Sequence, residues 1–251
     1  LRLILQTGSG APGNRTPQYL KYEFIKMKNL IFAAKFPLIN NFLLNLSKYN
    51  RLKIHNLFLE NTVYDNSCSV LDVGTTADTH ESNNILLQNT RNNKNISCLS
   101  DQDLGILKKK FPHVKNFYLG DGKKTNFPEN SFDIIFSSAV IEHVGTFKDQ
   151  IDFIKECIRI GKHQVFITTP NRYYPIDFHT RIPFLHWLPK KIHRFILKII
   201  GFKFYSLEKN LNLLDRKTII KIMESLNIQN YTILNHKFLY ATSNLILIIK
   251  L

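Results

Sequence analysis

The pattern of hydrophobic positions changes near residue 60, and the two parts of the chain predict different structures. Before that point, apolar residues recur every three or four positions, which indicates amphipathic helices. Five residues carry this spacing: Phe36, Ile39, Phe42, Leu43 and Leu46. Beyond that point, short apolar runs alternate with helical patterns, an order typical of a parallel sheet with helices on both faces.

The middle of the chain contains five patterns of buried strands, at residues 69–73, 96–99, 114–119, 132–137 and 164–168. Helices are expected at residues 103–110, 148–160 and 217–226, and two closing strands at 231–240 and 245–251. We therefore expect a Rossmann-like, doubly wound α/β sheet, mostly parallel with an antiparallel C-terminal strand. N-terminal helices and an inserted helical lid complete this predicted fold.

The chain is expected to consist of a leader and one domain. Residues 1–26 include a glycine-rich, unpatterned stretch, and no methionine precedes Met27. Our hypothesis is that the native protein starts at Met27, and the alternative is a genuine disordered tail. The predicted domain, 27–251, has four parts, which are the N-terminal helices (27–66), the core (67–169), an insertion on the substrate side (170–212) and a C-terminal helix with strands (213–251).

The formal net charge is +15, from 34 Lys and Arg against 19 Asp and Glu. A charge of this size implies attraction to an anionic partner: nucleic acid, a phosphorylated substrate or an acidic membrane surface. The alternative is a protein from a lysine-rich proteome. The three cysteines form no CxxC pair, which argues against a disulfide framework and a thiolate zinc site and indicates a reducing, cytoplasmic compartment.

Histidine spacing gives no sign of a metal site. His179, His186 and His193 recur every seven residues, but Pro183 and Pro189 interrupt any helix that would align them. We therefore expect no metal.

Small and acidic residues follow the first predicted strand. Asp72 precedes Gly74 and Thr75, at the point where the carboxyl end of a strand in a doubly wound sheet meets ligands. Glycine there would let the backbone approach a ligand closely. An ordinary strand-to-helix turn is the alternative.

Acidic residues also follow the second and third predicted strands. Asp101 or Asp103 is placed to bind ribose hydroxyls, and a helix N-cap is the alternative for either residue. Asp121 with Gly122 is placed to accept from an adenine amino group, or to form a tight Asp-Gly turn.

Four blocks together resemble the class I S-adenosylmethionine-dependent methyltransferases, and specifically the methyltransferase type 11 group. The blocks are Val70-Leu71-Asp72-Val73-Gly74, Gly120-Asp121, residues 127–135 and Ile141-Glu142-His143-Val144. The resemblance covers residues 67–169. It implies that S-adenosylmethionine is the cofactor and that a methyl group is transferred.

The resemblance also implies roles for individual residues, carried over by position. The methionine end of the cofactor would contact Asp72, Gly74 and Thr75, and its sulfonium would lie beside Ser137 and Ser138. The ribose would be held by Asp101 or Asp103, and the adenine by Asp121 and Gly122. Glu142 and His143 would face the substrate, with His143 as the candidate general base and Glu142 behind it. A structural role for His143 is the alternative.

The first loop departs from the family pattern, because threonines follow Gly74 where the family usually has further glycines. A relative that binds no cofactor is therefore one alternative, and an RNA-directed methyltransferase, suggested by the charge, is another. A recognisable RNA-binding module is absent from the sequence. A nicotinamide-dependent dehydrogenase fits worst, because the loop lacks the glycine fingerprint of that class.

The insertion contains a basic amphipathic helix. Residues 181–204 include six Lys or Arg and no acid, and one helical stripe is apolar: Ile192, Phe195, Ile196, Ile199 and Ile200. This pattern predicts either peripheral contact with an anionic membrane or a lid over the active site. The expected acceptor is accordingly a small molecule, a glycan or a lipid-linked intermediate.

Overall fold

The computed structural model describes residues 37–80 and 83–251, and the predicted leader, residues 1–26, lies outside them. The chain divides into two compact units, residues 1–44 and residues 45–251. The described part of the first unit is the beginning of helix α2 (Pro37–Asn61). The other described elements belong to the second unit.

One sheet of seven strands forms the centre of the second unit, as far as the described residues show. Its order is β3-β2-β1-β4-β5-β7-β6. The strands are β1 (Val70–Val73), β2 (Ile96–Ser100), β3 (Asn116–Leu119), β4 (Phe132–Ser138), β5 (Gly161–Pro170), β6 (Tyr231–Phe238) and β7 (Ala241–Lys250). Neighbours among the first five strands are parallel, and β7 is antiparallel to both β5 and β6. The expected Rossmann-like sheet with an antiparallel C-terminal strand is confirmed.

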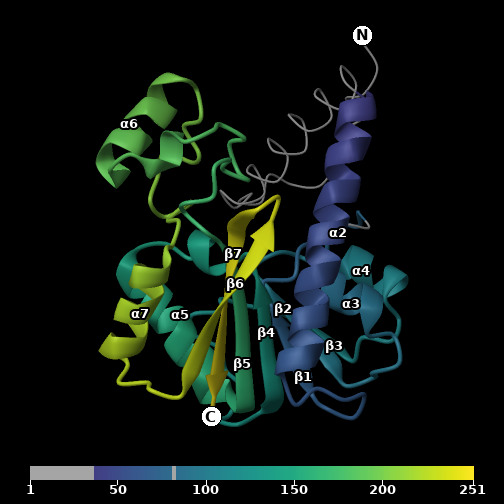
Figure 1. The fold of residues 1–251 in the computed structure, drawn as a ribbon. Helices are drawn as coiled ribbons and strands as arrows, with labels where there is room; N and C mark the ends of the chain where they lie inside the picture. The colour runs from purple at the N-terminus through teal and green to yellow at the C-terminus, as the bar shows by residue number, and fades with distance from the viewer. Residues whose placement is uncertain (1–36, 81–82) are drawn as a thin grey trace, which may run out of the picture. The chain divides into compact units, whose positions relative to one another are not determined.

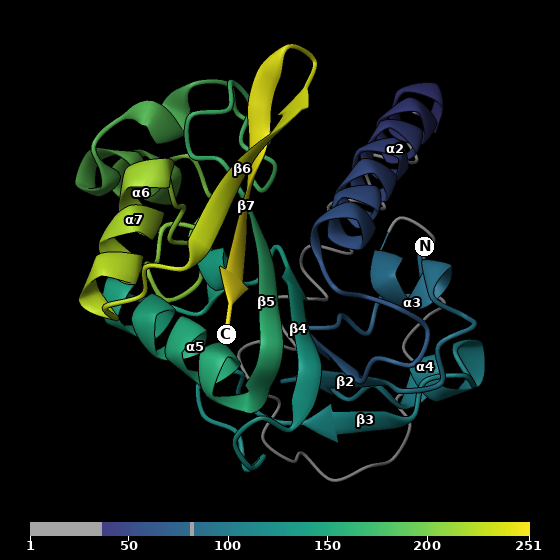
Figure 2. The same ribbon diagram turned by 60° about the horizontal axis from the view of Figure 1, so that its bottom comes forward.

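Helices cover both faces of the sheet (Figures 1 and 2). Helices α5 (Phe147–Ile160) and α7 (Arg216–Ser225) lie on one face, and α2, α3 (Ile85–Asn89) and α4 (Gly105–Lys110) lie on the other. Strand residues alternate between the two resulting cores. Leu71 and Ile135 face α5, whereas Val70 and Ile134 face the α2 side, as the two-residue period of a strand requires.

Helix α2 is anchored to the sheet by one aromatic side chain. Phe58 is fully buried, and its ring meets those of Phe136 and Phe166 edge-on, with centroids 5.1 and 5.3 Å apart. Edge-to-face packing of this kind adds to the free energy gained by burial. The part of α2 that belongs to the second unit, residues 45–61, therefore contributes to the core of that unit.

Helix α3 was not expected from the sequence. It comprises five residues, and its three apolar members, Ile85, Leu86 and Leu87, are all buried. Consecutive apolar residues show no helical period, so the pattern could not distinguish this single turn from a loop.

The insertion between β5 and α7 contains a short 3₁₀ helix, η2 (Leu185–Trp187), and helix α6 (Lys190–Ile199). The residues of α6 that are buried are His193 and Leu197. The predicted apolar stripe is instead largely exposed, with Ile192 at 49%, Phe195 at 65% and Ile199 at 67%. This stripe therefore does not pack against the rest of the described domain, and the lid stays a prediction.

Candidate active site

Strand order places the candidate site at the carboxyl ends of β1 and β4. From β1 the chain proceeds to β2 and β3 on one side, and it then crosses back to β4 and β5 on the other. In open α/β sheets, ligands bind in the crevice outside the strand ends where this reversal occurs. Candidate residues predicted from the sequence lie at or just beyond the carboxyl ends of β1, β2, β3 and β4, so the topology brings their backbone positions to one edge of the sheet.

The carboxyl group of Asp72 is buried near the end of β1. Its side chain accepts a hydrogen bond of 3.0 Å from the hydroxyl of Thr75, which also donates to the Asp72 carbonyl oxygen at 3.1 Å. Burial raises the pKa of Asp72 to about 7, although the hydrogen bond from Thr75 acts in the opposite direction. This group can therefore gain or lose a proton near neutral pH, and a cation beside it would favour the ionised form.

Position 74 requires glycine for two reasons. Its φ is +90°, a conformation that L side chains rarely adopt, and an added Cβ would lie 2.3 Å from a methyl group of Val140. The neighbouring Thr75 is 3% exposed and turned inward toward Asp72, which holds the loop without further glycines.

The loop after β2 is tied to the loop after β1. The side chain of Gln102 accepts from the backbone N–H of Ala77 at 3.2 Å. Asp103 accepts from the N–H of Gly105 at 2.8 Å, but the N-cap residue of α4 is Leu104, which makes no side-chain cap hydrogen bond, so the expected N-cap role of either acid is wrong. Asp101 and Asp103 are both exposed.

In the turn after β3, the side chain of Asp121 stabilises the turn and is also exposed to solvent. The carboxylate of Asp121 accepts from the N–H of Lys123 at 2.9 Å, which forms the predicted tight turn, while the Asp121 side chain remains 62% exposed. An added Cβ on Gly122 would lie 2.9 Å from Val73, so glycine permits this turn to approach β1 closely.

The serines at the end of β4 are hydrogen bonded within the sheet. Ser137 is fully buried and donates to the carbonyl oxygen of Val73 at 2.9 Å. Ser138 shares a 3.0 Å hydrogen bond with the hydroxyl of Thr168. Their hydroxyl groups therefore link β4 to its two neighbouring strands.

A polar cluster follows β4, in the 3₁₀ helix η1 (Ile141–His143) and the loop that faces it. The Nε2 atoms of His143 and His179 are 3.1 Å apart, and Oε1 of Glu142 is 3.9 Å from each of them. Glu142 is fully buried, and its Oε2 accepts from the hydroxyl of Thr169 at 3.0 Å. We call Glu142, His143 and His179 the acid–histidine cluster.

The Nδ1 atom of each imidazole ring in this cluster is hydrogen bonded to an oxygen atom on the side of the ring away from the cluster. Nδ1 of His143 lies 2.8 Å from the carbonyl oxygen of Asn210, and Nδ1 of His179 lies 3.0 Å from the carboxylate of Asp177. Burial raises the pKa of Asp177, but hydrogen bonds from His179 and Thr180 outweigh it and hold that pKa well below its usual range. Asp177 is thus an ionised acceptor for the ring.

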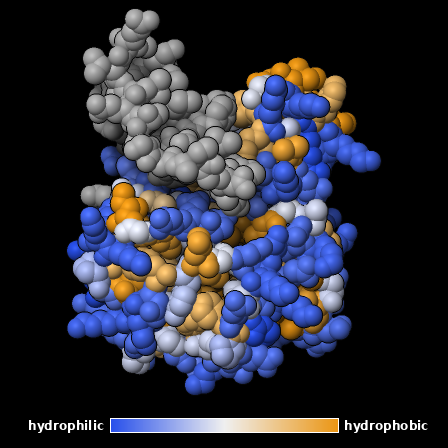
Figure 3. All heavy atoms as spheres, turned by 180° about the vertical axis from the view of Figure 1, so that it is seen from behind, coloured by the Kyte–Doolittle hydropathy of each residue, from blue (hydrophilic) through white to orange (hydrophobic). Residues whose placement is uncertain are grey.

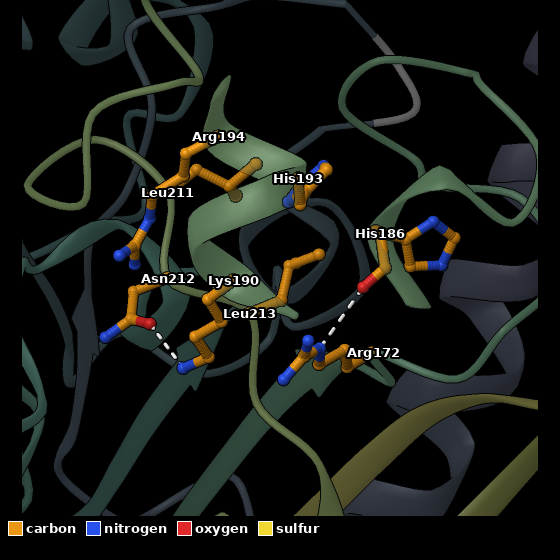
Figure 4. A pocket seen from close by; sticks show the side chains of 8 residues that line it. All are labelled: Arg172, His186, Lys190, His193, Arg194, Leu211, Asn212 and Leu213. Atoms are coloured by element: carbon orange, nitrogen blue, oxygen red, sulfur yellow. Dashed lines mark hydrogen bonds between the residues drawn. The ribbon is translucent and has the colours of Figure 1, made fainter. Parts of the chain in front are cut away.

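A cationic pocket lies beside the cluster, beneath α6 (Figure 4). Its charged residues are Arg172, Lys190 and Arg194, and its remaining lining residues are His186, His193, Leu211, Asn212 and Leu213. Burial, together with the charges of Arg172 and Arg194, lowers the pKa of Lys190. Burial also lowers the pKa of His193 to about 4, so this imidazole is neutral at pH 7.

Asn212 connects the cationic pocket to the acid–histidine cluster. Its side chain accepts from the amine of Lys190 at 2.6 Å, as drawn in Figure 4, and donates to the carbonyl oxygen of Gly145 at 3.1 Å. Its backbone N–H donates to the carbonyl oxygen of Glu142 at 2.7 Å. One buried residue therefore bonds to the pocket and to the turn that carries Glu142.

Sequence reasoning proposed Glu142 and His143 as candidates but missed the side chains that surround them in the structure. His179 and Asp177 lie in the insertion, and the sequence carried no signal that this loop folds back onto η1. Arg51 on α2 was also missed. Burial lowers the pKa of Arg51, and the nearby carboxylates of Asp78 and Glu142 act in the opposite direction.

Residues 83–168 match a family model described as a methyltransferase domain. The matched segment begins after the first loop, so Asp72 and Gly74 lie outside it and Glu142 and His143 lie inside it. A search among curated proteins gives no match.

Solved structures with the same fold include two proteins whose titles describe them as SAM-dependent methyltransferases. One is from Archaeoglobus fulgidus, with a TM-score of 0.52 and 14% identity over 88% of this chain and 99% of that chain. The other is from Aquifex aeolicus, with a TM-score of 0.51 and 14% identity over 78% of this chain and 88% of that chain. At this identity the likeness concerns the fold.

Proposed function

We propose that this chain, which contains a methyltransferase domain of the class I S-adenosylmethionine-dependent family, transfers a methyl group to an acceptor held at the acid–histidine cluster. One observation carries the proposal. The buried carboxyl group of Asp72 lies near the end of β1, at the reversal of strand order, and the cluster follows the adjacent strand β4.

The residues present fit S-adenosylmethionine. Burial raises the pKa of Asp72 to about 7, so the ammonium group of the cofactor's methionine part would stabilise the ionised carboxylate. Thr75 lies beneath the first loop rather than above it, because its hydroxyl bonds to Asp72. The exposed carboxylates of Asp101 and Asp121 would hold the ribose and the adenine.

When bound, the cofactor supplies an electrophilic methyl group, so the protein contributes mainly alignment and proton transfer. The carbonyl oxygen of Asn210 can only accept, so the proton of a neutral His143 ring is on Nδ1 and its Nε2 is basic. His143 would take the proton of an acceptor hydroxyl through Nε2. Glu142 and His179 would stabilise the resulting imidazolium.

We further propose that the acceptor carries an anionic group and lies at a lipid surface. Three cationic side chains line the pocket beneath α6. One of them, Arg194, is paired with Glu208 at 3.1 Å, and the other two, Arg172 and Lys190, suit an anionic group such as a phosphate. The exposed stripe of α6 suits the interface of an anionic membrane. In Figure 3, hydrophobic residues gather on the surface in the region of α6. A phosphorylated, lipid-linked acceptor satisfies both features.

No helix within the described residues has the length and apolar character to cross a membrane. We propose that the contact is peripheral and is made by α6, because exposed apolar side chains and basic side chains lie together on this helix.

The cofactor part of the proposal is tested by calorimetric titration with S-adenosylmethionine and S-adenosylhomocysteine. We expect saturable 1:1 binding that is lost in Asp72→Ala and retained in Asp133→Ala, a variant at the opposite end of the sheet. Absence of binding to the unmodified protein would identify a non-catalytic relative and overturn the proposal.

The acceptor is sought with the labelled methyl donor in lipid, aqueous and RNA fractions of a cell extract. We expect label in the lipid fraction, reduced by about 10²-fold or more by His143→Ala, the size of effect that loss of a general base produces. Label confined to the RNA or the aqueous fraction would contradict the lipid-linked acceptor.

A further inference from the structure

We propose that the acid–histidine cluster, Glu142, His143 and His179, is a binding site for one divalent transition-metal ion. The three residues offer one ligand atom each, and they come from η1 and from the insertion. Two imidazole nitrogens and one carboxylate oxygen are a frequent ligand set for zinc and for other first-row divalent ions with open coordination positions.

The separations of the ligand atoms agree with a shared ion. The two Nε2 atoms are 3.1 Å apart, and Oε1 of Glu142 is 3.9 Å from each. A point equidistant from three atoms with these separations lies about 2.1 Å from each, the usual length of zinc–nitrogen and zinc–carboxylate bonds. One ion could therefore contact all three atoms without rearrangement of the backbone.

The hydrogen bonds behind the rings determine which nitrogens face the ion. The Asn210 carbonyl oxygen and the ionised Asp177 carboxylate can only accept, so Nδ1 of each ring carries a proton. For neutral rings, the lone pairs of both Nε2 atoms then face one another at 3.1 Å. Two lone pairs at that distance repel, and a cation between them removes the repulsion.

The hydrogen bonds of the two Nδ1 atoms are of the kind that metal-binding histidines usually make. Such a histidine donates its other ring N–H to a carboxylate or a backbone carbonyl, which fixes the ring and strengthens the ligand. Asp177 does this for His179, Asn210 does it for His143, and Thr169 orients the carboxylate of Glu142. The ring of Tyr205 packs edge-on against His179, with centroids 5.8 Å apart.

The charges around the cluster also favour a cation. The carboxylates of Glu142 and Asp177 lie beside two rings, and the nearby guanidinium of Arg51 is shared between Glu142 and a third carboxylate, Asp78. The side chains of His143 and His179 are 23% and 12% exposed, so a small ion and one oxygen of an acceptor could reach them from solvent.

A metal here would change the role of His143 in the proposed function. The ion would lower the pKa of a coordinated acceptor hydroxyl, and His143 would act as its ligand rather than as the base. This use of the ion rests on the proposed methyl transfer, whereas the metal site itself does not.

The test is metal binding to full-length protein after removal of metals with a chelator. We expect Zn²⁺ to bind with a stoichiometry of one in calorimetry, and Co²⁺ to give visible absorption bands of a nitrogen- and oxygen-ligated ion. His179→Ala and Glu142→Gln should each weaken Zn²⁺ binding at least tenfold, and Asp177→Asn should weaken it by about 10- to 100-fold. His163→Ala, a half-exposed histidine at the opposite end of the sheet, should bind as the parent does.

The absence of saturable Zn²⁺ and Co²⁺ binding by the unmodified protein would overturn the proposal and would indicate a proton, rather than a metal, between the rings. Binding that is unchanged in the ligand variants would also overturn it. Circular dichroism confirms that each variant is folded. S-adenosylhomocysteine binding is measured on the same samples, so a failed metal site and a failed cofactor site give different results.

Discussion

The hydroxyl group of Thr75 donates a 3.0 Å hydrogen bond to the buried carboxyl group of Asp72. Threonine thus occupies a position where the family usually has glycine, and it serves the acid that the cofactor is proposed to meet. The bond opposes the effect of burial on the pKa of Asp72, which is about 7. Two predictions concern this pair.

Cofactor binding is expected to strengthen as the pH rises through 7. Below that pH the Asp72 carboxyl group is protonated and neutral, and above it the ionised group attracts the ammonium of the cofactor. Between pH 6 and pH 8 the affinity for S-adenosylhomocysteine should rise about tenfold, as a group with this pKa changes from mostly protonated to mostly ionised. Calorimetry across this range measures the rise, and Asp72→Asn should show a flat profile.

Replacement of Thr75 by valine should move that pH profile upward. The variant lacks the hydrogen bond that lowers the pKa of Asp72, so ionisation requires a higher pH. Thr75→Ser keeps the hydroxyl group and serves as the matched control. A profile for Thr75→Val that coincides with the parent profile would show that the hydroxyl group does not set this pKa.

Gly74→Ala should destabilise the protein more than Gly201→Ala. Both glycines have positive φ, +90° and +88°, so both variants pay the same backbone strain. Only the alanine at position 74 would overlap Val140, whereas position 201 has no atom within 4 Å. We expect the free energy of unfolding to fall by about 1–3 kcal/mol more for Gly74→Ala, measured by urea denaturation. Equal losses would contradict the close approach.

Phe58→Ala should lower the free energy of unfolding by about 3–5 kcal/mol, because it leaves a cavity between α2 and the sheet. Phe195→Ala removes the same side chain from a position that is 65% exposed and should change that free energy by no more than about 0.5 kcal/mol. Similar values for both variants would show that α2 contributes little to the core.

Binding to anionic vesicles should depend on the exposed stripe of α6. Ile199→Ser should weaken co-sedimentation with vesicles that contain phosphatidylglycerol by about tenfold, since a fully buried isoleucine contributes about 1.5–3 kcal/mol. Leu119→Ser replaces an aliphatic residue of similar exposure on β3 and is the control. Binding that is equally strong to neutral vesicles, or insensitive to salt, would contradict the electrostatic part of the proposal.

The sequence predicted the sheet well because its strands are short apolar runs bounded by polar residues. Each of the seven expected strands is present, with bounds that shift by a few residues, such as β3 starting at Asn116 instead of residue 114. The amphipathic pattern of α6 was also recognised. Its exposure could not be predicted, because periodicity reports an apolar face without reporting what covers it.

The candidate site was predicted only where its residues follow strands. Asp72 was predicted because strand ends meet at one edge of a doubly wound sheet, and His143 was predicted from the resemblance of residues 141–144 to the family. His179 comes from an insertion, and its contact with His143 depends on a loop path that no periodic pattern encodes. Spacing along the chain suggested no metal site, whereas the folded side chains bring together the three ligand atoms of the site that we propose.

The buried amide of Asn212 has a consequence for how the protein would choose among acceptors. An anion that draws the Lys190 amine into the pocket would pull on the 2.6 Å bond to this amide, and the pull would reach the backbone of Glu142 through a second bond of 2.7 Å. Binding of the anionic end of a long acceptor in the pocket would thereby change the position of Glu142, beside the acceptor's reacting end. A fragment too short to span both places would forgo that adjustment and should react more slowly even when it saturates the enzyme.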